Sequence, residues 1–173
     1  GFYKNRRGVL RIFAQVMEAV PEARLCMAGP SPTRMLHALA RELGVADRVD
    51  WLVDPNDQCV ADAYRRASVL LFPSLYEGFG WPVLEAMAFG LPVVASDAGS
   101  LPEVIGDAAT CFDPADEQGM AAAVLRLLAS PEAHAEAVER GLARAEAFSE
   151  VAFAARMRDA YLTAAGHRDK QAT

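Results

Sequence analysis

Five short apolar runs divide the first two thirds of this chain into alternating strands and helices. Strands are expected over 25–28, 49–53, 69–72, 93–96 and 110–112. Each run lacks the strict alternation of a strand with one wet face, so each is expected to be buried on both faces. Buried strands separated by helices are parallel. The sequence therefore predicts an α/β fold, a doubly wound, Rossmann-like sheet of about five strands with flanking helices.

Helical periodicity fills the gaps between these runs. It predicts a first helix over 8–19, ended by Pro21. Ser31-Pro32 is expected to cap a second helix, which Gly44 ends. Further helices are expected over 57–67, 82–89 and 117–129, with others opening at Ser130 and Ser149. These elements fit one domain over 1–165, followed by a disordered tail over 166–173.

Charge and cysteine content narrow the class of protein. The net charge of −6 argues against a nucleic-acid partner and against a basic membrane-surface protein. The three cysteines, Cys26, Cys59 and Cys111, are widely spaced and lie in apolar runs, so we expect buried free thiols in a reducing, cytoplasmic compartment. No apolar run approaches the roughly 18–20 residues of a membrane span, and the first residues do not resemble a signal peptide.

Ligands of a doubly wound sheet bind beyond the carboxyl ends of its strands, where loops lead into helices. Four loops are therefore candidates: 29–32, 54–57, 73–82 and 97–102. The third has the most distinctive sequence. Glu77 and Glu85 stand eight positions apart, with Gly78, Gly80 and the helix-opening Pro82 between them.

This glycine-containing loop has the composition of an anion site. Glycines let the backbone approach a ligand closely, and the first amides of the following helix are unpaired and point outward. Such amides, together with the helix dipole, hold phosphate. Glu85 falls in the first turn among apolar residues, so we expect its carboxylate to be partly screened from water and to accept hydrogen bonds from a ribose. Glu77 can reach a second sugar beyond the phosphates. An alternative for Glu85 is a simple helix-dipole contact.

The same stretch resembles the C-terminal, donor-binding domain of glycosyltransferase family 4, the retaining enzymes of the two-domain GT-B fold. The similarity lies in Glu77-Gly78-Phe79-Gly80 followed by Glu85-Ala86-Met87-Ala88, and in the downstream segments 90–96, 101–104, 106–108 and 112–114. It extends from the first residues to about Tyr161. The resemblance implies that this chain is one half of a GT-B fold.

The resemblance also implies roles for individual residues. Glu77 would contact the donor sugar at the reaction centre, and Lys4, in Tyr3-Lys4-Asn5, would neutralise the diphosphate, which makes these two the catalytic residues. Glu85 would bind the ribose of a nucleoside diphosphate sugar. The other implied donor-binding residues are Gly78, Phe79, Gly80, Val83 and Leu84, with Gly29 and Leu52 at neighbouring strand ends and the base near 51–54.

Parts of the family pattern are absent from this sequence. The family's diphosphate-binding Arg lies at the end of a first strand that we do not find here, so we expect that strand and an N-terminal acceptor domain to precede residue 1. Arg6 or Arg7 is a weaker substitute for that arginine. Membrane association, where relatives have it, would run through the acceptor domain.

No aspartate pair has the spacing of the metal-binding D-x-D motif, so neither a catalytic metal nor a cofactor is expected. None of the three histidines is expected to act as a general base. The leading interpretation is the donor-binding domain of a retaining glycosyltransferase that transfers a sugar to an acceptor hydroxyl. Two alternatives stay open: a nucleotide-sugar binding module without turnover, and another GT-B enzyme such as a sugar-nucleotide epimerase.

Overall fold

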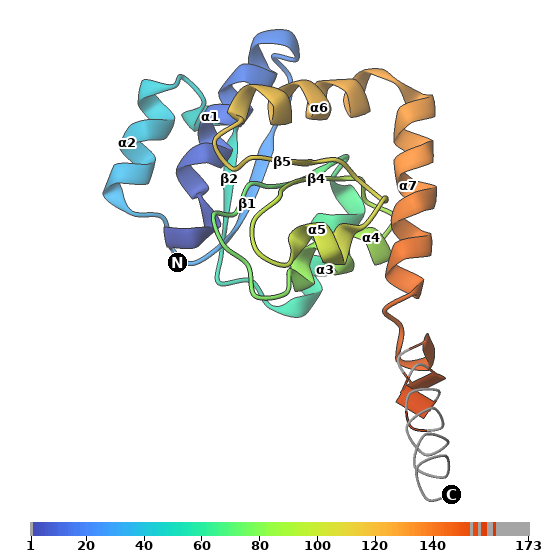
Figure 1. Ribbon diagram of the computed structural model, residues 1–173. Coiled ribbons are helices and arrows are strands. Elements are labelled where there is room, and N and C mark those ends of the chain that lie inside the picture. The colour runs from blue at the N-terminus through green and yellow to red at the C-terminus, as the bar shows by residue number, and fades with distance from the viewer. Residues whose placement is uncertain (1, 153, 156, 159–160, 162–173) are drawn as a thin grey trace, which may run out of the picture.

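A computed structural model describes residues 2–152, 154, 155, 157, 158 and 161 (Figure 1). Its strands are β1 (Leu25–Gly29), β2 (Val49–Val53), β3 (Leu70–Phe72), β4 (Val93–Ser96) and β5 (Cys111–Phe112). Its helices are α1 (Arg6–Ala19), α2 (Arg34–Glu42), α3 (Asp57–Arg66), α4 (Trp81–Ala88), α5 (Leu101–Ile105), α6 (Glu117–Ala129) and α7 (Pro131–Glu146). Two short 3-10 turns, η1 (Phe2–Lys4) and η2 (Ala46–Arg48), complete the elements. The predicted α/β order is confirmed.

The helix starts differ from the prediction where capping was misjudged. The α1 helix begins at Arg6 because the side chain of Asn5 accepts a hydrogen bond from the amide of Gly8. The predicted cap Ser31 is wrong: Thr33 has the extended backbone of an N-cap, and its side chain accepts from the amide of Leu36. Gly44 has a φ of 70° just beyond α2, which suits its predicted role as the stop.

The strands are parallel, as predicted, but they form two sheets instead of one. β1 pairs with β2, and β3, β4 and β5 form a second sheet in that order. The α1 helix joins the two parts. Leu10 and Phe13 pack with Met27 of β1, whereas Ile12 and Val16 pack with Val94 of β4.

Burial on both faces holds for only part of this arrangement. All four residues of β4 are buried. In β1 only Met27 is buried, between exposed Cys26 and Ala28, because α3 contributes no buried residue to cover the second face. The cysteines are free, as predicted, but the expectation that they are buried is wrong: Cys26 and Cys59 are exposed and Cys111 is half-buried.

The C-terminal part of the described chain is helical, as predicted. The α6 helix crosses α1, and α7 runs along the other end of the domain against α4 (Figure 1). Ser130 caps α7, and Ser149 accepts from the amide of Ala152 at the start of further helical residues. The predicted tail over 166–173 lies outside the described residues. Within the described part of the chain, no helix combines the length and apolarity needed to cross a bilayer.

Candidate functional site

The glycine-containing loop follows β3 and is fixed against the loop that follows β4. The Ser96 hydroxyl donates to the carbonyl of Ser74 over 2.5 Å, and the Ser100 amide and hydroxyl each lie 3.3 Å from the carbonyl of Glu77. Gly99 has a φ of +61°, and a Cβ at this position would lie 2.3 Å from the Glu77 carbonyl oxygen. Only glycine therefore fits where the two loops meet.

The two predicted catalytic residues are in direct contact although 73 positions separate them. Lys4 Nζ donates to Glu77 Oε1 over 2.7 Å. Glu77 is only 8% exposed, so its carboxylate is held beneath the ammonium group. The Leu75 amide donates to the Tyr3 carbonyl over 2.7 Å, and the ammonium lies 4.7 Å from the centroid of the Phe72 ring. These contacts fix the N-terminal segment beside the end of β3.

The loop offers a short run of unpaired backbone donors. Among the described residues, none accepts a hydrogen bond from the amides of Gly78, Phe79 or Gly80. Gly80 has a φ of +100°, and a Cβ there would lie 2.6 Å from a methyl group of Leu101. The Val83 amide, in contrast, already donates to the Gly80 carbonyl over 2.9 Å. Within the predicted cradle over 78–84, the Val83 amide is therefore engaged inside the domain.

The α4 helix turns Glu85 outward while burying its apolar neighbours. Val83 is fully buried and Leu84 is 6% exposed, but Glu85 is exposed. The prediction of a screened carboxylate is therefore wrong, since apolar neighbours in sequence lie on the other side of the helix. One contact does hold it: the Tyr64 hydroxyl lies 3.2 Å from Glu85 Oε2. Burial, then the charge of Glu85, raises the pKa of Tyr64 well above its usual range.

Gly29 and Leu52 lie at the carboxyl end of the two-stranded sheet. Gly29 is the last residue of β1, with a φ of +140°, open space around it, and a carbonyl that accepts from the Asp54 amide over 2.9 Å. Leu52 is half-buried on β2, opposite Ala28. In the part of the chain that the structure describes, no hydrogen bond joins either residue to Glu77 or Glu85. The predicted site residues thus form two groups, one on each sheet.

Neither suggested substitute for the diphosphate-binding arginine reaches the loop over 77–85. Arg6 turns to the end of β1, where Nη1 donates to the Pro30 carbonyl over 2.8 Å and Nε lies 3.3 Å from the sulfur of Met27. Burial lowers the pKa of Arg6. Arg7 lies against the sulfur of Met35. Of the basic residues of this segment, Lys4 contacts the loop over 77–85, through Glu77.

Histidines and metal-binding groups add little to this site. The His37 ring packs against Trp51 at 5.1 Å between centroids, and His134 Nε2 lies 3.2 Å from the Ser68 carbonyl oxygen. His167 lies outside the described residues. Over the ranges described, no three His, Cys, Asp or Glu side chains are grouped closely enough to hold a metal ion.

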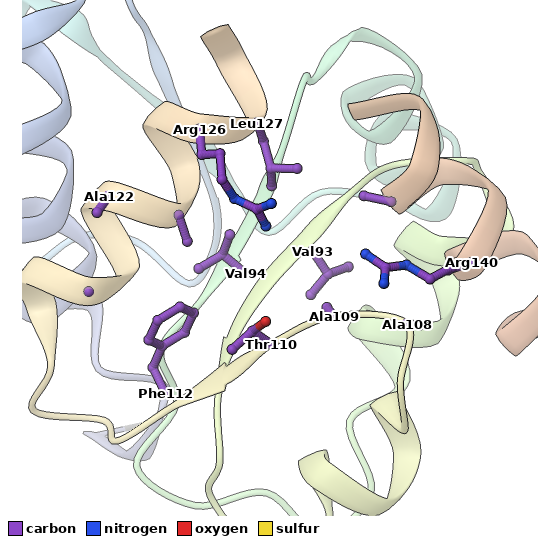
Figure 2. A pocket seen from close by; sticks show the side chains of 13 residues that line it. Val93, Val94, Ala108, Ala109, Thr110, Phe112, Ala122, Arg126, Leu127 and Arg140 are labelled. Atoms are coloured by element: carbon purple, nitrogen blue, oxygen red, sulfur yellow. The ribbon is translucent and has the colours of Figure 1, made fainter. Parts of the chain in front are cut away.

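A cavity of about 300 Å³ lies elsewhere, between β4, β5, α6 and α7 (Figure 2). Its walls are mostly small apolar side chains, and the Arg126 and Arg140 side chains extend toward it. It contains none of the predicted site residues. The contact between Lys4 and Glu77 and the unpaired amides described above lie instead at the loop after β3.

Tyr64 is a functional candidate that sequence reasoning missed. It sits in the last turn of α3, one strand before the loop, and contacts Glu85 across 21 positions. No spacing rule links a tyrosine on one helix to a glutamate on another. The only available signal was an aromatic residue with a polar tip in the helix that precedes β3.

Fold and site together define a class of protein. This is a parallel α/β domain with a lysine, two glutamates and unpaired loop amides near the carboxyl ends of its strands. These are features of domains that bind the phosphates of a nucleotide. Residues 1–144 match the family described as glycosyl transferases group 1, and the chain belongs to this family.

Individual relatives agree with this assignment. A D-inositol 3-phosphate glycosyltransferase 2 of Catenulispora acidiphila is 41% identical over 92 residues, a stretch that covers 46% of this chain and 21% of that relative. Anabaena HepE, solved in complex with UDP and glucose, superposes with a TM-score of 0.80 at 21% identity, covering 95% of this chain and 46% of HepE.

The C-terminal domain of LpcC, a group 1 glycosyltransferase of Francisella tularensis, superposes with a TM-score of 0.73 at 21% identity. That match covers 83% of this chain and 78% of the LpcC domain. The chain therefore has the fold of one half of a GT-B glycosyltransferase, and it spans less than half the length of the two-domain relatives.

Proposed function

We propose that this chain is the donor-binding domain of a retaining glycosyltransferase that moves a sugar from a nucleoside diphosphate to an acceptor hydroxyl, with no metal or other cofactor. The observation that carries the proposal is the contact between Lys4 and the buried Glu77, next to the amides of 78–80, for which the described residues offer no acceptor. A cation and free amides suit a diphosphate, and a buried acceptor suits sugar hydroxyls.

Lys4 and the loop amides act on the leaving group in this proposal. An ammonium group has three donors, and the contact with Glu77 uses one of them. The others can bind the diphosphate, whose negative charge grows as the bond to the sugar breaks. A positive charge already positioned beside the diphosphate stabilises the transition state. The amides of 78–80 add donors that need no rearrangement.

The two glutamates bind hydroxyl groups on either side of the diphosphate. Glu77 accepts from the donor sugar and holds Lys4 in place; it is not proposed as a nucleophile. Glu85 accepts from the ribose, and the base lies toward Gly29 and Leu52. The acceptor hydroxyl attacks the face of the sugar from which the diphosphate leaves, so positioning provides much of the rate.

We further propose that a sixth strand fills the space between the two sheets. No ladder joins β1 and β3 within the described residues. The start of the described chain bridges the ends of these strands, because Tyr3, before α1, accepts from Leu75 after β3, and Arg6, the first residue of α1, donates to Pro30 after β1. A parallel strand leading into α1 between these edges forms an ordinary right-handed crossover to β1. Such a strand would connect this domain to an acceptor domain.

Donor binding and transfer are tested separately. Calorimetry with UDP, ADP and GDP on the 173-residue chain tests donor binding, with UDP first because HepE binds it. In a protein carrying both domains, Glu77→Gln is expected to lower transfer roughly 100-fold. Unchanged transfer would contradict the role of Glu77. Mass spectrometry must find free nucleoside diphosphate together with glycosylated acceptor; a donor that is only epimerised would contradict transfer.

A further inference from the structure

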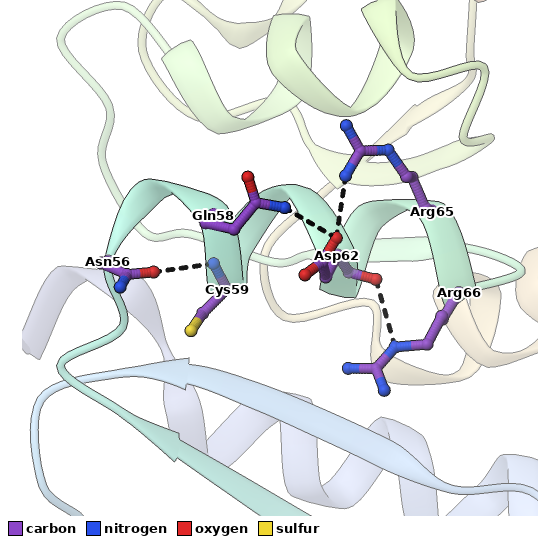
Figure 3. Close-up of polar contacts among 6 residues, drawn as sticks. All are labelled: Asn56, Gln58, Cys59, Asp62, Arg65 and Arg66. Atoms are coloured by element: carbon purple, nitrogen blue, oxygen red, sulfur yellow. Dashed lines mark hydrogen bonds and ion pairs between the residues drawn. The ribbon is translucent and has the colours of Figure 1, made fainter.

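The α3 helix is attached to the domain in an unusual way. None of its ten residues is buried. Along most of its length its polar contacts are local: Asn56 caps Cys59, and Asp62 accepts from Gln58 and Arg65 (Figure 3). These contacts stabilise the helix but do not join it to another element.

The last turn of α3 supplies the connection, and α4 is its partner. The Tyr64 hydroxyl lies 3.2 Å from Glu85 Oε2 and 3.4 Å from the Pro82 carbonyl oxygen. The Tyr64 ring lies 5.6 Å from the Phe89 ring, and the Arg65 guanidinium lies 5.1 Å over the same ring. The contact surface between α3 and α4 therefore includes Glu85 itself.

This hydroxyl changes what the Glu85 carboxylate can do. An exposed glutamate otherwise rotates freely among several conformations and loses that freedom when a ligand binds. A hydroxyl that donates to Oε2 fixes the carboxylate and leaves Oε1 free to accept from a ligand. A tyrosine hydroxyl is protonated at neutral pH and can therefore donate, and the partial burial of Tyr64 raises its pKa further.

We propose that Tyr64 is a positioning residue that orients Glu85 for the ribose of the donor. The inference rests on the proposed function, since it assigns Glu85 to the ribose. Tyr64 acts through Glu85 and does not itself touch the donor. The α3 helix, which contributes no buried side chain, thereby has a role in affinity.

Tyr64→Phe tests this role because it removes the hydroxyl and keeps the ring against Phe89. Calorimetry of the 173-residue chain with UDP is expected to show roughly 3- to 10-fold weaker binding than wild type. The same variant is expected to bind 2′,3′-dideoxy-UDP as the wild type does, because that ligand lacks the hydroxyls that Glu85 accepts from. In a Glu85→Ala background, Tyr64→Phe is expected to have no further effect on UDP binding.

A matched control is Tyr161→Phe, which removes a hydroxyl from a side chain that is 70% exposed. It is expected to leave UDP affinity unchanged. Equal melting temperatures of wild type and Tyr64→Phe would show that the fold is intact. The inference would be overturned if Tyr64→Phe bound UDP as tightly as the wild type does. It would also be overturned if the variant lost as much affinity for 2′,3′-dideoxy-UDP as for UDP, because that result would indicate a merely structural role. If the wild type binds none of UDP, ADP and GDP, the proposed function fails, and the inference fails with it.

Discussion

The two sheets of this domain have the same parallel topology but differ in what covers them. All four residues of β4 are buried, whereas β1 has a single buried residue. The α1 helix packs on both sheets, but α3 places no buried residue against the second face of β1 and β2. A parallel connection therefore does not by itself bury a strand on both faces; a second helix must also pack there.

The predicted site residues are also divided between the two sheets. Glu77 and Glu85 belong to the three-stranded side, and Gly29 and Leu52 to the two-stranded side. Two residues near the start of α1 contact the two sides: Lys4, just before the helix, contacts Glu77, and Arg6, its first residue, contacts Pro30. Under the proposed function, the residues assigned to the phosphates and the sugar lie beside the buried sheet, and those assigned to the base lie beside the more exposed one.

Alanine at two positive-φ glycines, one on each side, gives the largest expected contrast. The Cβ added by Gly29→Ala has no other atom within 4 Å, so this substitution lowers the unfolding free energy only through backbone strain, by about 1–2 kcal/mol. Gly99→Ala adds a collision with the backbone of Glu77, for a total of about 2–5 kcal/mol. Denaturant unfolding measures both. Equal losses of unfolding free energy would mean that the two loops are not in close contact.

Truncation of one strand residue in each sheet gives a smaller contrast. Val94→Ala in β4 removes two methyl groups from a side chain that is 2% exposed, and is expected to cost about 1–3 kcal/mol. Cys26→Ala in β1 is expected to change stability by less than about 0.5 kcal/mol, because Cys26 is exposed. Denaturant unfolding measures both changes. If Cys26→Ala lowered the unfolding free energy as much as Val94→Ala does, the second face of β1 would be covered after all.

The smallest expected effect concerns the surface pair of Arg24 and Asp50 in the two-stranded half. Arg24 donates twice to the Asp50 carboxylate, and this hydrogen bonding lowers the pKa of Asp50. The folded protein thus binds the Asp50 proton less readily than the unfolded chain, so the pair contributes stability above the usual carboxyl pKa of about 4 and loses it as the pH falls further.

Arg24→Ala is therefore expected to lower stability slightly at pH 7, with the difference from wild type shrinking toward about pH 2. Unfolding curves at both pH values measure it. If the stability difference between wild type and Arg24→Ala grew as the pH fell, the stabilising effect assigned to the ionised Asp50 carboxylate would be wrong.

The positions of the strands along the chain, and the place of Lys4 and Glu77 in one site, could be predicted from sequence. Short apolar runs located every strand to within about a residue, and the family pattern placed Lys4 and Glu77 at one site. These features are local in sequence or repeated across a family, so one chain suffices to find them.

Features that depend on tertiary packing could not be predicted. The separation of β1 from β3, the exposure of Cys26 and the contact of Tyr64 with Glu85 depend on which faces helices cover in three dimensions. The apolar neighbours of Glu85 suggested screening, but they are buried on the opposite side of α4. The α5 helix was missed because its five residues are too few to show periodicity.

The central claim is that a nucleoside diphosphate binds at the loop after β3. Titration of the ¹⁵N-labelled chain with UDP, ADP or GDP, followed by two-dimensional NMR, tests it most directly. With the ligand that binds, the largest shifts are predicted at the amides of Gly78, Phe79 and Gly80, and Lys4→Met should strongly reduce them. Absence of shifts with all three ligands, or largest shifts around the cavity lined by Thr110 and Arg126, would contradict the account.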